Sequence, residues 1–263
     1  AGIRPGDRII TIDSATVAGI GIKNSDVRKR TLGKKGSEVV IGIRRSGKKE
    51  IINFTIKRDK IPIKSLAAAY MVDDNIGYIK LTRFSAGMMK EYSAAMDSLI
   101  KLGMKHLILD LGGNGGGYLN IAVELGDEFL GEDQLIVFTE GVNNRKKEEL
   151  GTKKGKHEKG RLVLLINEGS ASASEIVSGA IQDWDRGVLI GRRTYGKGLV
   201  QRQYPLSDGT ATRITIAHYY TPSGRSIQRP YDKGQDEYKN ELRNRKKNGE
   251  LSNIDSIPQN DSL

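Results

Sequence analysis

The sequence predicts an α/β protein, in which a layered core of alternating strands and helices follows a smaller, mostly β segment. Two observations lead to this prediction. From Ile76 onward, apolar strand-like runs alternate with amphipathic helical runs, a pattern typical of α/β layers. The first 58 residues instead contain short apolar runs separated by Gly, Pro, Asp and Ser, as in strands joined by turns. A chain of 263 residues is long enough for both parts.

The first part, residues 1–58, is expected to contain three strands and one short helix. In each strand, Ile and Val stand at alternate or consecutive positions. The last two strands are joined by a Gly-containing hairpin turn. The predicted strands are residues 8–12, 39–43 and 51–56, and the predicted helix is 23–32.

Residues 59–75 are expected to form a connector, and residues 76–231 the α/β core. The helix expected to follow the first core strand has Ser85 as its cap and Gly103 at its end. Residues 232–263 are rich in Lys, Asn, Glu and Asp, so we expect a polar tail, either a loose helix or disordered. The predicted core strands are 77–81, 106–111, 135–139, 161–166, 188–191, 199–206 and 210–220, and the predicted helices are 85–102, 119–130 and 172–184.

Composition excludes several functional classes. The chain has no cysteine, so disulfides, thiol catalysis and thiolate metal sites are absent. The net charge of +11 is spread over many loops and no nucleic-acid module accompanies it, so a solvated surface is favoured over nucleic-acid binding. The three histidines show no metal-ligand spacing with acidic residues, and we expect no metal or cofactor. No apolar stretch is long enough to span a bilayer.

The strongest chemical signal is the segment Gly169-Ser-Ala-Ser-Ala-Ser-Glu-Ile176, directly after the apolar strand 162–166. A turn of small residues between a strand and a helix can expose a hydroxyl, here Ser172, where free backbone N–H groups favour negative charge. That is the setting an acyl-transfer oxyanion requires. The structural alternative is a capping box, since Glu175 stands three residues after Ser172 and reads as a helix-end charge.

Lys197 is the candidate base for Ser172. None of the three histidines stands in a turn that would present it to the serine, whereas Lys197 lies between two glycines. A lysine acts as a base only when neutral, which requires burial, and the flanking apolar strands 188–190 and 199–200 are expected to supply it. Gln201 is placed to hydrogen-bond the amine and to hold it on the serine.

The stretch Gly191–Lys197 also fits the first seven positions of a phosphate-binding P-loop. The eighth position must be Ser or Thr to reach Mg²⁺, but Gly198 stands there. A helix should follow, whereas residues 199–204 alternate like a strand. ATP binding is therefore disfavoured.

Three motifs together resemble the C-terminal processing peptidases, or tail-specific proteases. They are GSASASEI, TYGKGLVQ with Lys197 placed 25 positions after Ser172, and YYTPSGRSIQ. The resemblance implies that Ser172 is the nucleophile, Lys197 the general base and Gln201 the residue that orients the lysine. It places the oxyanion hole on the backbone N–H groups of Ala173 and of a glycine within residues 115–117, for which we choose Gly116.

The glycine run itself, Asp110-Leu-Gly-Gly-Asn-Gly-Gly-Gly117, corresponds to the Asp-Leu-Arg-x-Asn-x-Gly-Gly segment of that family. One position departs from the pattern, because Gly112 stands where the family has Arg. The support of this loop therefore needs another explanation. Residues 1–58 resemble the second half of a PDZ domain through Ala1-Gly-Ile-Arg-Pro-Gly-Asp7. The implied fold is a crotonase-like (ClpP/crotonase) layered peptidase core preceded by a partial PDZ domain.

The resemblance implies a serine endopeptidase that cleaves proteins near their C-termini through an acyl-enzyme. Its partners would be proteins with apolar C-terminal tails bound by the PDZ domain. The implied location is extracytoplasmic in a bacterium, periplasmic or envelope-associated, with a membrane tether outside this sequence. Two alternatives stay open: a PDZ scaffold on an inert peptidase fold, and thioester chemistry on a crotonase-like core. The second is disfavoured because the chain offers serine and lysine rather than acidic catalysts.

Overall fold

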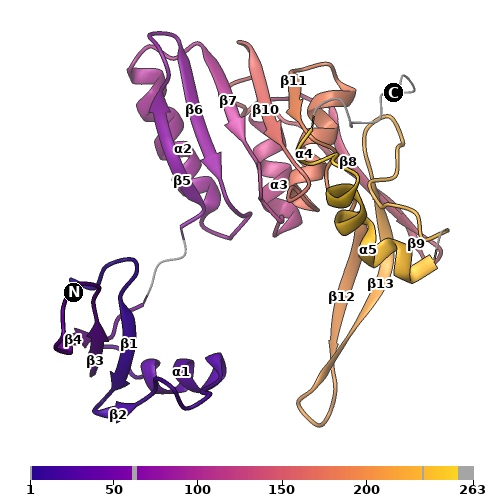
Figure 1. Ribbon diagram of the computed structural model, residues 1–263. Helices are drawn as coiled ribbons and strands as arrows, with labels where there is room; N and C mark the ends of the chain where they lie inside the picture. Colours follow the sequence, from indigo (N-terminus) through magenta and orange to yellow (C-terminus); the bar gives the residue numbers. More distant parts are fainter. Residues whose placement is uncertain (1, 61–63, 233, 254–263) are drawn as a thin grey trace. The chain divides into compact units, whose positions relative to one another are not determined.

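The computed structural model describes residues 2–60, 64–232 and 234–253 (Figure 1). The chain divides into two compact units, Ala1–Ile63 and Lys64–Leu263, which we call the N-terminal unit and the core unit. Within the described residues, the helices are all too short or too polar to cross a membrane.

The N-terminal unit is a four-stranded antiparallel sheet with one helix. Its strand order is β2-β1-β3-β4, and its apolar centre is formed mainly by β3, which carries Val39, Ile41 and Ile43. A bidentate ion pair from Arg45 to Asp7, at 2.8 Å for both contacts, joins the end of β3 to the start of the unit. The elements are β1 (Arg8–Ile12), β2 (Ala15–Thr16), α1 (Asn24–Thr31), β3 (Glu38–Arg44) and β4 (Ile52–Lys57).

The core unit is built on a five-stranded sheet of order β11-β10-β7-β6-β5. The first four strands are mutually parallel, and β5 pairs antiparallel with β6 at the edge. Parallel strands buried under helices are expected to be rich in Leu and Ile, as this sheet is. The strands are β5 (Leu66–Met71), β6 (Ile76–Leu81), β7 (His106–Asp110), β10 (Leu162–Ile166) and β11 (Val188–Gly191).

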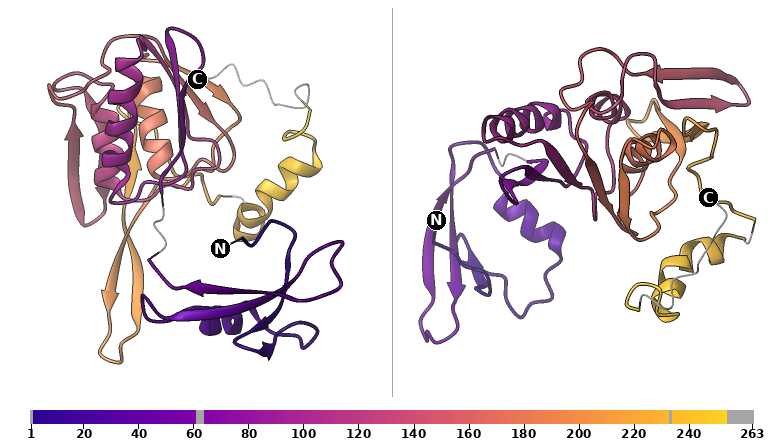
Figure 2. Two further views of the ribbon diagram at one scale, coloured as in Figure 1. Left: turned by 90° about the vertical axis from the view of Figure 1, so that its left-hand side faces the viewer. Right: turned by 90° about the horizontal axis from the view of Figure 1, so that it is seen from above.

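Three helices pack side by side in this unit, with α3 between α2 and α4 (Figures 1 and 2). Each buries an apolar stripe, and the main hydrophobic core lies between these stripes and the sheet. Fully buried members include Leu109 in the sheet, Met96 and Leu125. The helices are α2 (Met88–Lys101), α3 (Leu119–Asp127) and α4 (Ala173–Asp183).

A second sheet of order β12-β13-β8-β9 contacts α4 through β8. Its β12–β13 pair extends as a long two-stranded ribbon away from the rest of the core unit (Figure 1). The remaining elements are β8 (Leu135–Gly141), β9 (Asn144–Leu150), β12 (Leu199–Pro205), β13 (Ala211–Tyr220) and the C-terminal helix α5 (Gly234–Lys247).

Four features differ from the sequence-based expectations. Helix α2 begins at Met88 rather than Ser85, because the Ser85 hydroxyl bonds that of Ser65 at 2.7 Å instead of capping the helix. Strand β5 lies within the expected connector 59–75. Strand β9 was not predicted, because its Lys and Glu side chains are solvated and form ion pairs along one strand. Strand β2 was not predicted either, since only three strands were expected in residues 1–58. Residues 234–247 form a helix, one of the two forms expected for the polar tail, and ion pairs rather than apolar burial hold it against the loop of residues 192–198.

Candidate active site

The chemically important segments lie at one edge of the five-stranded sheet. They are the loops that follow β7, β10 and β11, namely residues 111–118, 167–172 and 192–198. Because these strands are parallel neighbours, their carboxyl ends meet, and ligand sites of open α/β sheets lie there. Topology thus brings together segments that are far apart in the sequence.

Ser172 sits on a strained turn between β10 and α4. Its backbone angles, φ 57° and ψ −112°, lie outside the regions that L-residues ordinarily adopt, and it is the residue before the first turn of α4. Such a strand-to-helix turn presents a nucleophilic serine at the end of a helix in several hydrolases. Strain of this kind costs about 1–3 kcal/mol and persists only where the surroundings enforce it.

Hydrogen bonds from Ser170 hold this turn in place. Its buried hydroxyl donates to the carbonyl of Leu111 at 2.8 Å and accepts the N–H of Asn167 at 3.0 Å. The turn after β10 is therefore fastened to the loop after β7. Ser170 has a structural role, and Ser172 lies half-buried at the helix tip.

Glu175 connects the nucleophile turn to the lysine loop. Its carboxylate accepts the backbone N–H of Ser172 at 2.7 Å, of Gly196 at 2.6 Å and of Lys197 at 2.9 Å. The side chain is buried, with 5% of the residue exposed. The expectation of a helix-end charge was therefore incomplete, since Glu175 also holds a loop 21 residues further on. The capping pattern pointed to the first contact, but nothing in the sequence pointed to the other two.

Asn114 fastens the glycine run to the nucleophile turn. It is fully buried; its Nδ2 donates to Leu81 O at 3.0 Å and its carbonyl accepts Ala171 N–H at 3.0 Å. The same carbonyl accepts the Ser174 hydroxyl at 2.8 Å. This role was missed in the sequence, although an Asn inside a glycine run after a buried strand is a usable signal.

The structure places the two expected oxyanion groups next to each other. A Cβ atom added to Gly116 would lie 2.9 Å from the Ala173 nitrogen and 2.9 Å from Ser172 Cβ, so the two backbones almost touch. The Ala173 N–H is the first of α4 and has no acceptor within the helix. The Gly116 N–H, however, donates to Asn114 Oδ1 at 2.9 Å. The choice of Gly116 within residues 115–117 therefore stays a prediction.

Lys197 and Gln201 are both exposed, so the burial expected for Lys197 is absent in this conformation. In the described part of the chain, the Lys197 amine forms no hydrogen bond with Ser172 or Gln201. The reason lies in the neighbouring strands: Val188 and Ile190 are more than half exposed, and the β12–β13 ribbon is open to solvent. The Glu175 carboxylate joins the backbones of Ser172 and Lys197, whereas no hydrogen bond joins their side chains in the described residues.

Lys80 supports the glycine loop at the position where Gly112 departs from the resembled pattern. Its amine contacts Asp110 Oδ2 at 2.5 Å and the Gly112 carbonyl at 3.5 Å, while Asp110 Oδ1 accepts the Gly112 N–H at 2.7 Å. Tyr78 donates to Asp110 at 2.6 Å. Burial disfavours the charge of Asp110, but these hydrogen bonds outweigh it and hold its pKa below the ordinary value.

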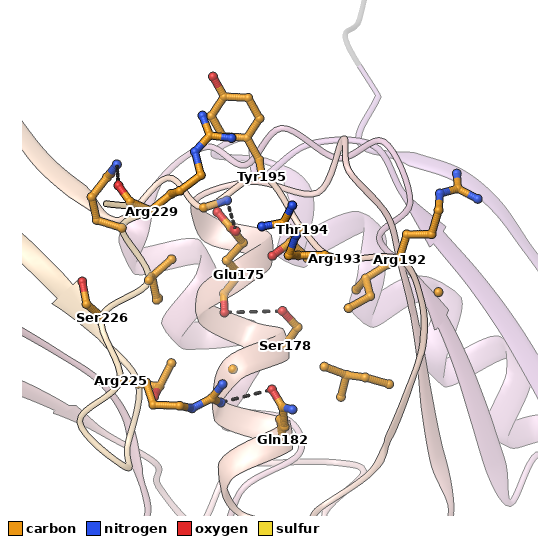
Figure 3. Close-up of a pocket in the computed structure, with 18 of the residues that line it drawn as sticks. Glu175, Ser178, Gln182, Arg192, Arg193, Thr194, Tyr195, Arg225, Ser226 and Arg229 are labelled. Atoms are coloured by element: carbon orange, nitrogen blue, oxygen red, sulfur yellow. Dashed lines mark hydrogen bonds between the residues drawn. The ribbon is translucent and has the colours of Figure 1, made fainter. Parts of the chain in front are cut away.

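A cavity of about 650 Å³ lies beside the lysine loop and one face of α4 (Figure 3). Its charged lining is mainly arginine, and each of the four arginines has an acidic partner. Glu168 pairs with Arg192 at 2.7 Å, and the hydrogen bonds from Arg192 hold the pKa of Glu168 below its ordinary value. The other three pairs are Arg193–Glu241, Arg225–Asp183 and Arg229–Glu241.

The histidines take no part in this site. Burial lowers the pKa of His157, which packs against Phe129, and His106 accepts the N–H of Arg161 at 3.1 Å. Across residues 2–60, 64–232 and 234–253, no group of three or more His, Asp and Glu is arranged to hold a metal ion. The P-loop alternative also fails, because the strand β12 rather than a helix follows Lys197.

Comparison with known proteins identifies the family. The family model described as Peptidase family S41 matches residues 75–234. The carboxyl-terminal-processing protease of Synechocystis sp. is 37% identical over 235 residues, which cover 87% of this chain and 53% of that protein. The carboxy-terminal processing protease CtpA of Bacillus subtilis is 37% identical over 229 residues, covering 87% of this chain and 48% of that protein.

Solved structures agree with this match. A photosystem II D1 C-terminal processing protease is 29% identical with a TM-score of 0.57, over 86% of this chain and 61% of that one. A putative S41 protease from Bacteroides fragilis shares the fold at 16% identity and a TM-score of 0.59, over 86% and 64% of the two chains. The chain spans about half the length of the curated relatives it matches. On the family match over residues 75–234, the chain belongs to peptidase family S41.

Proposed function

We propose that this chain is the catalytic part of a serine endopeptidase that cleaves proteins near their C-termini, with Ser172 as nucleophile and Lys197 as general base. Family membership supports the reaction class. The observation that carries the residue assignment is the shared carboxylate of Glu175, which fixes the backbone of strained Ser172 and the backbone of Lys197 relative to each other. The helix N-terminus at Ser172 supplies the positive field that an oxyanion requires.

In the proposed reaction, neutral Lys197 takes the hydroxyl proton of Ser172 while the serine oxygen bonds to the substrate carbonyl carbon. The resulting oxyanion is held by the Ala173 N–H and by one N–H of residues 115–117. The C–N bond then breaks as Lys197 returns the proton to the leaving amine, which leaves an acyl-serine. Water, deprotonated by the same lysine, attacks the acyl carbon. The bond from this carbon to the serine oxygen then breaks as Lys197 returns the proton to that oxygen, which frees Ser172 and the carboxylic acid product.

Catalysis by this route requires the Lys197 side chain to leave solvent and reach Ser172. Catalytic hydrogen bonds are often long in proteins without substrate and tighten only in the complex. We propose that a peptide lying across the sheet edge covers Lys197, removes its water and favours the neutral amine. Gln201, on β12 after the lysine loop, would then orient the amine.

The N-terminal unit and the core unit have separate roles in this proposal. The N-terminal unit, the antiparallel sheet with α1, is proposed to be part of a PDZ domain that binds the apolar C-terminal tail of a protein substrate. The core unit is proposed to be crotonase-like in architecture. The resemblance also favours a bacterial extracytoplasmic location, periplasmic or envelope-associated, for the whole protein.

The decisive variants are Ser172→Ala and Lys197→Ala, assayed on an unstructured protein with an apolar C-terminus. Each is expected to reduce cleavage by about 10³-fold or more, since members of such a catalytic unit fail together. Ser207→Ala and Lys159→Ala, both at exposed positions, are the matched controls and should cleave normally. Near-normal cleavage by Lys197→Ala would overturn the assignment of the base.

The second candidate function is a binding module with an inert peptidase fold. The exposure of Lys197 is the observation in its favour. An active-site-directed fluorophosphonate distinguishes a peptidase from an inert binding module. A catalytically competent site is labelled at Ser172, and an inert site is not.

A further inference from the structure

The lysine loop, residues 192–198, has no regular secondary structure of its own. Its position therefore depends on the groups that hold its backbone, and Glu175 holds one side. The C-terminal helix α5 lies, apart from its first residue, beyond the residues matched by the family model, which end at 234. Helix α5 contacts the same loop at two further points.

The first contact is at Arg193, near the start of the loop. Its guanidinium pairs with Glu241 of α5 at 2.7 Å, and its carbonyl accepts a hydrogen bond from Arg245 at 3.2 Å. Arg245 is the buried residue of α5, at 4% exposed, and it pairs in turn with Glu250 at 2.6 Å. Both the side chain and the backbone of Arg193 are thus bound by the helix.

The second contact is indirect and reaches the glycines on either side of Lys197. The Gly198 N–H donates to Gln228 Oε1 at 3.0 Å, and Gln228 Nε2 donates to the Tyr238 hydroxyl of α5 at 3.1 Å. The Gly196 carbonyl accepts the Arg229 N–H at 3.0 Å. The Arg229 guanidinium pairs with Glu241, donates to the Tyr238 carbonyl at 2.9 Å and lies 3.9 Å from the centre of the Tyr238 ring.

The packing around Gly196 and Gly198 leaves no room for a side chain. A Cβ atom at Gly198 would lie 2.3 Å from the Gln228 nitrogen, and one at Gly196 would lie 2.7 Å from Arg229 Cβ. Residues 228–229 therefore form a layer between α5 and the backbone that carries Lys197. A shift of that layer must be transmitted to the lysine loop, because groups packed this closely cannot absorb it. Helix α5 is joined to the layer by the Tyr238 and Glu241 contacts.

We infer that α5 is a strut for the lysine loop, and that Glu241 and Tyr238 are positioning residues for Lys197. The catalytic part of this inference rests on the function proposed above; the structural part, that α5 restrains residues 192–198, does not. Helix α5 is held by ion pairs and hydrogen bonds rather than by apolar burial. Its attachment to the lysine loop therefore weakens as salt screens the charges. The lysine loop of this chain is therefore predicted to loosen at high ionic strength.

The test compares Glu241→Gln and Tyr238→Phe with Glu237→Gln, a matched control one turn earlier on α5 for which the structure shows no ion pair. Hydrogen exchange of the backbone amides of residues 194–200 is measured first. Both variants are expected to accelerate this exchange by about tenfold while exchange in β7 stays unchanged, and the control is expected to leave both unchanged. Wild type in about 1 M NaCl, where the screening length is about 3 Å, is expected to behave like Glu241→Gln.

Cleavage kinetics give the second measurement. A displaced base lowers kcat more than it raises KM, since ground-state binding of the peptide does not use Lys197. If wild type cleaves nothing, the proposed function fails, but the exchange measurement still decides whether α5 restrains the loop. Unchanged exchange over residues 194–200 in both variants and in high salt would overturn the inference. The salt measurement keeps the test decisive if a variant does not fold.

Discussion

The backbone conformation that places the Ser172 hydroxyl also lowers the stability of the fold. Its positive φ presents the hydroxyl at the tip of α4, and the hydrogen bonds of Ser170 and the Glu175 carboxylate hold the turn in that strained form. A non-glycine residue in this conformation costs free energy of folding whether or not it carries a hydroxyl. The strain therefore comes from the backbone conformation at position 172, not from the hydroxyl. Glycine relieves it because glycine has no Cβ atom.

This leads to a prediction about two inactive variants. Ser172→Gly should unfold with a free energy about 1 kcal/mol higher than Ser172→Ala, because glycine adopts positive φ without steric cost. Urea unfolding of the two variants under one set of conditions measures the difference. Equal stabilities would show that the turn stores no backbone strain.

Asp110 gives a prediction about pH at the same scale. Its folded pKa lies below the ordinary 3.8, because Lys80, Tyr78 and the Gly112 N–H bond the charged form. Its contribution to stability is therefore fully present above about pH 4 and is lost as the pH falls through the lowered folded pKa. The Asp110→Asn variant has no carboxylate to protonate at this position. As the pH falls, it should therefore lose less stability than the wild type does.

The measurement is the urea midpoint of the core unit between about pH 2 and pH 6. Lys80→Met should raise the Asp110 pKa and move the loss of stability to higher pH, since the carboxylate would keep its burial but lose its cation. If Asp110→Asn and wild type lose stability in parallel over this range, the charged cluster does not support the glycine loop.

At the scale of elements, α4 organises the site. Its first turn carries Ser172, Ala173 and Glu175, and its N-terminus faces the glycine run. The sequence predicted this helix within one residue at each end, and it pointed to the cap, because both are local patterns. The contacts of Glu175 with Gly196 and Lys197 could not be predicted, since they depend on β10 and β11 lying side by side.

The element-scale prediction concerns Glu175→Gln. An amide offers one acceptor oxygen where the carboxylate oxygens receive three N–H groups, so the lysine loop loses at least one of its bonds. A misplacement of about 1 Å costs about 10²-fold in rate, and we expect a loss of this size in kcat with a smaller change in KM. Steady-state kinetics beside Gln182→Glu, a change of opposite sign on the same helix, would measure it; full activity of Glu175→Gln would contradict the linking role.

For the whole molecule, the sequence predicted two parts and the α/β alternation of the second. Both predictions rest on the spacing of apolar residues, which lies within each short stretch of the sequence. It did not predict strand β9 or the firm attachment of α5, since charged, solvated elements show no apolar period. The expected burial of Lys197 was absent for a related reason: the exposure of β11 and the β12–β13 ribbon depends on what packs against them. Local chemistry was predictable, and the assembly of distant loops was not.

Two compact units predict two separate unfolding transitions, since multi-domain chains seldom unfold as one. Ile43 and Leu109 are fully buried in different cores. Ile43→Ala should lower only the transition of the N-terminal unit, and Leu109→Ala only that of the core unit, each by about 2–5 kcal/mol. Calorimetry of both variants checks this, and a shift of both transitions by either change would show that the units unfold together.

The central claim is that Lys197 activates Ser172, and the rate of fluorophosphonate labelling as a function of pH tests it most directly. Wild type should be labelled at Ser172, as located by peptide mass spectrometry, with a rate that rises with pH, because a general base must be unprotonated to activate the serine. Lys197→Ala should lose this labelling while Lys159→Ala keeps it. Labelling of Ser172 at the wild-type rate and with the wild-type pH profile in Lys197→Ala would contradict the account.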